Sequence, residues 1–166
     1  MKKSFVIGLM LLTTSFAQAD IKIAIVDMQK VVQSSSAGKK AKATLEEEFN
    51  KKKKELEKKE AELKKMNDDI EKKKAVMSED ALQKRHQEFQ GEMMKYRELV
   101  NKSQGEIQKR QSELAAPIME KISKVLDRMM KEKAYDLILE NNPGILRSVS
   151  SMNISDEVLK EIEKEK

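Results

Sequence analysis

The sequence has no cysteine and no tryptophan, only two prolines and five glycines in 166 residues, and 4% aromatic residues. Without cysteine the chain can form neither a disulfide framework nor a thiolate metal site, and it has no cysteine nucleophile. So few aromatic side chains leave little material for an enlarged hydrophobic core. Charged residues instead make up 38% of the chain, a composition typical of long solvated helices rather than of one packed globule.

Residues 1–19 have the three parts of a secretory signal peptide. The segment opens with two lysines, continues with the apolar run 5–12 and ends with an Ala-Gln-Ala cleavage site. The apolar run is shorter than the about 20 residues that a membrane-spanning helix needs. We therefore expect export, cleavage before Asp20, and a soluble mature chain.

Directly after this segment, residues 21–28 alternate like a half-buried β-strand. Ile21, Ile23 and Ile25 fall on one face, and the residues between them fall on the other. A lone strand cannot satisfy its own backbone hydrogen bonds. The strand therefore needs a partner from elsewhere in the chain or from another copy.

The middle of the chain, residues 37–116, predicts a helical hairpin. Apolar residues recur every seven positions on the way out: Phe49, Leu56, Leu63, Ile70 and Met77. The return segment contains two sets of residues with the same seven-residue spacing: Leu82, Phe89 and Tyr96, and also His86, Met93, Val100, Ile107 and Leu114. The outward and return sets mirror each other about residue 78, so that Phe49 would face Ile107 and Leu63 would face Met93. A hairpin with its tip near 76–80 buries both stripes, whereas one continuous helix would leave them needing a partner chain. Ser78, followed by two acidic residues, is a good helix start at that turn.

The hairpin seam is interrupted and its surface is cationic. Lys52, Lys59 and Lys73 occupy seam positions, so packing along the arm should be thin. Residues 50–75 hold eleven lysines and seven acidic residues, and residues 82–110 hold seven basic and four acidic residues. Most exposed charges simply solvate a helix, but the arm has a positive bias that the acidic C-terminal part lacks.

The rest of the chain predicts a small body built from residues 20–36 and 117–166. Residues 135–139 are typical of a strand, and residues 145–149, after an Asn-Pro-Gly turn, are typical of a second strand. Ser155 is typical of the residue that caps a helix, and it precedes a last predicted helix at 156–164. So few residues make a marginal core. With no disulfide to stabilise it, we expect oligomerisation, and we expect the first strand to pair within its chain and with other copies.

Five stretches resemble the Skp (OmpH-like) family of periplasmic chaperones, in the family's order along essentially the whole mature chain. They are Lys22–Met28 (KIAIVDM), Ser36–Lys39 (SAGK) leading into Thr44–Phe49 (TLEEEF), Lys133–Leu139 (KAYDLIL) and Asn153–Leu159 (NISDEVL).

The resemblance implies a mainly α fold, with a long antiparallel hairpin on a small β-strand trimerisation domain formed by both chain ends. It implies a periplasmic homotrimer whose three arms enclose a cavity for unfolded outer-membrane β-barrel proteins. The implied activity is that of an ATP-independent holdase, which prevents client aggregation and delivers clients toward outer-membrane assembly. In some members a basic cluster on the arm is proposed to bind lipopolysaccharide. No residues here match that cluster position by position, so peripheral contact with anionic lipid or lipopolysaccharide stays open.

Two sets of candidate functional residues follow. Strand positions predict the contacts between copies: Ile23, Ile25, Leu137 and Leu139. Adaptable methionines and lysines on the arm predict the client-facing surface: Met66, Met77, Met93, Met94, Lys58, Lys59, Lys64 and Lys65. Each methionine alone is better explained as a seam filler, and Met94, off both stripes, is the best candidate for an exposed contact.

The sequence lacks the residues that several kinds of chemistry require. No glycine-rich loop follows the first strand, so nucleotide binding has no support. His86 is the only histidine, and a metal site takes several such ligands. Carboxylates on solvated helices do not form an acid–base pair. We predict a protein that is not an enzyme and that uses no cofactor or metal.

Two rival classes remain. A nucleic-acid-binding protein would use cationic helices for phosphate contacts, but the signal peptide and the alternation of Glu with Lys argue against nucleic acid as a partner. A structural periplasmic coiled coil that spaces envelope components is the stronger alternative. Such a spacer would favour complete heptads, which the seam lysines interrupt.

Overall fold

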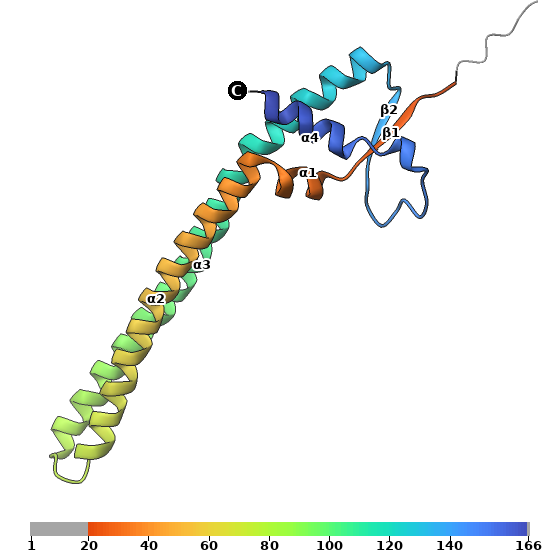
Figure 1. The fold of residues 1–166 in the computed structure, drawn as a ribbon. Coiled ribbons are helices and arrows are strands. Elements are labelled where there is room, and N and C mark those ends of the chain that lie inside the picture. Colours follow the sequence, from red (N-terminus) through yellow and green to blue (C-terminus); the bar gives the residue numbers. More distant parts are fainter. Residues whose placement is uncertain (1–19, 166) are drawn as a thin grey trace, which may run out of the picture.

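The computed structural model describes residues 20–165, so the expected signal peptide lies outside the described residues. In chain order the elements are β1 (Ile23–Val26), α1 (Met28–Ser34), α2 (Ser36–Lys73), α3 (Glu79–Lys133), β2 (Leu137–Glu140), a 3-10 turn (Ser150–Met152) and α4 (Ser155–Lys164). Helices α2 and α3 form one long arm, which projects from a small body that contains both ends of the described chain (Figure 1). The predicted fold class, mainly helical with a small β body, is confirmed.

The arm is an antiparallel hairpin, as the mirrored stripes predict. The chain turns between Lys73 and Glu79, and the Ala81 amide donates to the Ser78 hydroxyl at 3.4 Å, which caps α3. Two ion pairs cross between the helices: Lys52 with Glu106 at 2.6 Å, and Glu48 with Arg110 at 2.9 Å. These contacts within one chain exclude the continuous-helix alternative. At 1.5 Å per residue, the 38 residues of α2 span roughly 57 Å.

The first strand finds its partner near the other end of the chain. Strands β1 and β2 run parallel, with Ile23 opposite Leu137 and Ile25 opposite Leu139. Parallel neighbours need a long crossover connection, and here α1 and the whole arm supply it. On its other edge β1 is bridged by Asn153, and the Ile154 amide donates to the Ile25 carbonyl at 2.9 Å.

The hydrophobic core lies in the body rather than in the arm. Its buried residues come from β1, α1, α3, α4 and the residue just before α4: Ala24, Val26, Val31, Ile118, Ile122, Val125, Met129, Ile154, Val158 and Ile162. Helix α3 continues past Pro117 into this core with the wide apolar stripe of a well-buried helix. Within residues 20–165, no helix combines the length and apolar character that crossing a membrane requires.

Three sequence-based predictions about the body are wrong. Residues 145–149 form no strand, and Leu146 is 90% exposed, because strand-like residues become a strand only where a neighbouring backbone pairs with them. Ser155 does not cap α4 with its side chain; its buried hydroxyl accepts the Asp27 amide at 2.8 Å. Strand β1 is not half-buried, since Ala24, Ile25 and Val26 are all buried in succession. Packing on both sides of the strand overrides the simple alternation.

Candidate functional site

The four residues predicted to join copies of the chain lie together on one face of the sheet. Ile23 pairs with Leu137 and Ile25 pairs with Leu139, and residues two apart on a strand share a face. The opposite face, with Ala24, packs on the helical core. Within the single chain Ile25 is only 4% exposed, whereas Leu137 and Leu139 are 43% and 38% exposed. The outer strand therefore presents apolar side chains that the chain itself does not cover.

More exposed apolar side chains come from the segments that flank this sheet. They are Ile21 directly before β1, and Leu146, Val149 and Met152 after β2. Figure 1 shows that the loop after β2 lies next to the two strands. Several large apolar side chains left exposed on so small a body are typical of a protein–protein interface.

The four arm methionines have different exposures. Met94 is 71% exposed, while Met66, Met77 and Met93 are half-buried. Met66 lines a small hollow of the seam together with Leu63 and Glu92. Met94 is therefore available for contact, whereas the hairpin covers part of the surface of Met66, Met77 and Met93.

The four arm lysines do not form one surface. Lys58 and Lys65 are seven residues apart and share a face of α2, and Lys64 lies about 100° around the helix from Lys65. All three are exposed, and within residues 20–165 none of them is in an ion pair. Lys59 instead pairs with Glu62 at 2.8 Å, and this hydrogen bond raises the lysine pKa.

The seam contains a hollow that the sequence-based prediction missed. Phe49, Leu56, Val100 and Ile107 line it, and its volume is about 440 Å³. Ser103 also lines it, is 4% exposed, and has a hydroxyl group without a hydrogen-bond partner among the described residues. One signal was present: Ser103 continues the return set Leu82, Phe89 and Tyr96 at the same seven-residue step.

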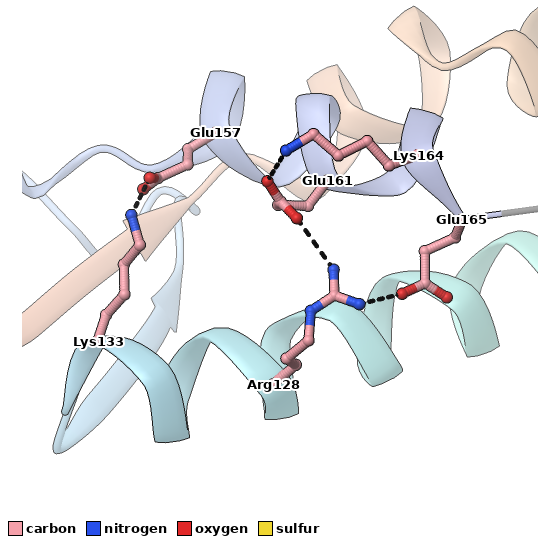
Figure 2. A network of polar contacts seen from close by, with 6 residues as sticks. All are labelled: Arg128, Lys133, Glu157, Glu161, Lys164 and Glu165. Carbon is pink, nitrogen blue, oxygen red and sulfur yellow. Dashed lines mark hydrogen bonds and ion pairs between the residues drawn. The ribbon is translucent and has the colours of Figure 1, made fainter.

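Within the body, an ionic network joins α4 to the C-terminal part of α3 (Figure 2). Arg128 of α3 lies between Glu161, at 3.1 Å, and Glu165, and Lys133 pairs with Glu157. Hydrogen bonding to Lys164, together with Arg128, holds the pKa of Glu161 below its ordinary value. The last helix is therefore tied along the C-terminal part of α3.

These carboxylates do not suggest a metal centre. Among residues 20–165, no three His, Asp or Glu side chains are grouped so that they could hold a metal ion. The functional features of the described chain are surfaces and a hollow. They define a class of protein: a long helical hairpin carried on a small body that both chain ends build and that exposes an apolar sheet face.

Comparisons with known proteins agree on one family. The family described as "Outer membrane protein (OmpH-like)" matches residues 22–162. A protein named "Chaperone protein Skp" from Blochmanniella pennsylvanica is 27% identical over 172 residues, covering 98% of this chain and 99% of that protein. An uncharacterized protein from Aquifex aeolicus is 27% identical over 164 residues, covering 99% and 98%.

A solved structure shares the fold. It is the crystal structure of an outer membrane chaperone (OmpH-like) from Caulobacter crescentus CB15, with a TM-score of 0.75 at 15% identity, covering 98% of this chain and 89% of that one. The chain therefore belongs to the OmpH-like (Skp) family, as its sequence resemblance indicates.

Proposed function

We propose that this protein is a periplasmic holdase chaperone that works without ATP. It binds unfolded outer-membrane β-barrel proteins, prevents their aggregation and delivers them toward outer-membrane assembly. The observation that carries this proposal is the pairing of an exposed apolar sheet face with a long arm in one small chain. Its full-length similarity to a protein named as a chaperone supports the same function.

In the proposed assembly, three copies join through the sheet face. Leu137 and Leu139 would then be covered, and the marginal body would gain the burial that its small core lacks. Joining the bodies would bring the three arms beside one another around a shared space; each arm is a single long projection from its body (Figure 1). An unfolded β-barrel chain, whose strands alternate apolar and polar residues, would be held in that space.

The arm surface suits transient binding of such chains. Met94 offers a flexible, polarisable contact, and Lys58 and Lys65 add a cationic strip on the outer surface of α2. A rigid spacer between envelope components would need a continuous packed seam, and the hollow around Ser103 interrupts this one. The observed packing therefore favours the chaperone over the spacer.

The decisive experiment dilutes a urea-unfolded outer-membrane barrel protein into buffer that contains the purified protein and no ATP. Light scattering should stay low once three chains are present for each client, and it should rise without the chaperone. Leu137→Asp, which would charge the sheet face, should lose this protection. Unchanged aggregation with an excess of folded wild-type protein would disprove the holdase function and favour the spacer.

A further inference from the structure

The hollow in the arm arises from a single layer of the seam. Along the seam Met66 faces Phe89, and Lys59 faces Tyr96. One heptad further from the tip, the same register sets Lys52 against Ser103. Neither residue can fill this layer, since the Lys52 ammonium turns outward to Glu106 at 2.6 Å and the serine side chain is small. This layer of the seam is therefore left unfilled, and it forms the hollow.

The walls of the hollow are apolar, and among the described residues its lining contains one buried polar group without a partner. Leu56, Val100 and Ile107 are half-buried around it, and Phe49 lies 54% exposed at its edge. The Ser103 hydroxyl lies 96% buried without a hydrogen-bond partner in the described chain. A buried hydroxyl left unpaired is unfavourable, so a ligand that brings both apolar surface and a hydrogen-bonding atom would satisfy both features.

The charges on the rim of the hollow cancel. Lys52 and Lys53 stand on it beside Glu57 and Glu60, two positive and two negative residues. Lys53 also lies 3.8 Å from Glu57. This local neutrality contrasts with the cationic arm, and it suits an uncharged ligand better than the anionic head group of a lipid.

A row of side-chain amides completes the rim. Gln104, Gln108 and Gln111 line the hollow from α3. Residues four apart on a helix rise about 6 Å, close to the roughly 6.6 Å between alternate residues of an extended chain. Because each amide both donates and accepts, the row can hydrogen-bond successive backbone groups of an extended polypeptide.

We propose that this hollow is a docking site, within one arm, for an extended uncharged segment of an unfolded polypeptide. A tyrosine or tryptophan side chain of the segment fills the hollow and hydrogen-bonds to Ser103, while its backbone runs along Gln104 and Gln108. This inference rests on the proposed function, since the segment belongs to a client. It goes further by placing a sequence-selective contact inside each arm, separate from the space between the arms.

The absence of tryptophan from the protein gives a clean assay. The probe is a neutral peptide of alternating Ser and Thr, blocked at both ends, with one central Trp. On titration with the purified protein, the Trp emission should shift to the blue and saturate. The same peptide with Ala in place of Trp should compete at least tenfold more weakly.

Two substitutions of equal size on α3 locate the binding site. Ser103→Leu fills the hollow and should weaken binding of the Trp peptide at least tenfold. Ser112→Leu is the matched control, because nine residues place Ser112 half a turn away on the exposed face of the same helix; it should bind like wild type. Thermal unfolding of both variants checks that each is folded. Ser103→Ala, which keeps the hollow, should weaken the Trp peptide but leave a Phe peptide unaffected.

Two results would overturn the inference. Equal affinity of folded Ser103→Leu and wild type for the Trp peptide would place the contact elsewhere. Displacement of the peptide by dodecanoate at lower concentration than by the peptide itself would identify an anionic amphiphile as the better occupant. A failure of the chaperone proposal would be detected by a different experiment, the aggregation assay with wild-type protein. That assay does not depend on how the short peptide binds.

Discussion

Both carboxylate oxygens of Glu163, near the end of α4, accept hydrogen bonds from Ser36, the first residue of α2. The Ser36 amide donates to Oε1 at 2.6 Å, and the Ser36 hydroxyl donates to Oε2 at 2.7 Å. A carboxylate at a helix N-terminus satisfies a free amide and interacts favourably with the helix dipole. The end of the chain therefore caps the start of the arm, and the same helix is tied to α3 through Arg128 (Figure 2).

This cap predicts a dependence of stability on pH. The hydrogen bonds from Ser36, led by its backbone amide, hold the pKa of Glu163 below its ordinary value of 4.5. A lowered carboxyl pKa contributes stability above the unfolded-state pKa and loses it as the pH falls through the folded-state pKa. Glu163→Gln should therefore lower Tm at pH 7, and the difference from wild type should shrink below pH 4.5. Thermal unfolding by circular dichroism at several pH values measures it, and a difference that persists undiminished at pH 3 would contradict the carboxylate cap.

The sharp corner between α1 and α2 depends on Gly38. A Cβ atom at this position would lie 1.7 Å from the Val32 carbonyl oxygen, a backbone atom that cannot move alone. Gly38→Ala should lower the free energy of unfolding by about 1–3 kcal/mol or more. Gly105→Ala is the matched control, because it adds the same methyl group to open space in α3 and should raise helix stability by about 1 kcal/mol. Urea unfolding of both variants measures these changes in the free energy of unfolding. Equal changes for Gly38→Ala and Gly105→Ala would mean that the corner between α1 and α2 adjusts freely to the added methyl group.

The assembly should depend on the outer face of the sheet. Leu137 is 43% exposed in the single chain, so Leu137→Asp should disrupt the contact between copies without burying a charge in the chain's own core. Ile25→Asp should unfold the body as well, since Ile25 is 4% exposed. Met94→Asp, on the arm, is the control and should remain a trimer. Sedimentation velocity over a range of concentrations reports the state, and a well-folded wild-type monomer at every concentration would refute the trimer.

Client capture should be faster for acidic clients because of the arm lysines. Changing Lys58, Lys64 and Lys65 to Glu should slow association of an acidic unfolded client by about tenfold at low salt. Adding Lys59→Glu should remove the Glu62 pair and slow capture further. Stopped-flow fluorescence measures the rate, and added salt should slow the wild type toward the variant, because screening acts beyond about 8 Å at physiological ionic strength. Equal rates at low salt would leave the arm charge with a role in solubility alone.

The arm could be predicted almost completely from the sequence. Its two features, a seven-residue repeat and a helix-start signal at Ser78, are local, and the hairpin follows because the two stripes mirror each other. The interhelical pairs of Lys52 with Glu106 and of Glu48 with Arg110 agree with that register to within about two residues. The hollow at Ser103 was within reach too, since the repeat continues through it.

The body was predicted less well, because its contacts join residues far apart in the chain. The existence of β1 and its partner near Leu137 followed from alternation and from the need to pair backbone groups. Ser155 is a good cap residue by propensity, yet its hydroxyl bonds the Asp27 amide, a partner that only folding brings near.

By itself the sequence determined the long hairpin and the small body at its base, since periodicity, helix signals and the order of the strands are properties of the chain alone. The family was indicated separately, by the resemblance of short stretches along the chain. Only the tertiary structure decided that β1 is enclosed on both sides, that residues 145–149 form no strand in the single chain, and that Glu163 caps the arm. The physical reason is that burial and polar pairing depend on which neighbours the fold supplies. The same Ser, Glu or Ile can be exposed, capped or buried according to those neighbours.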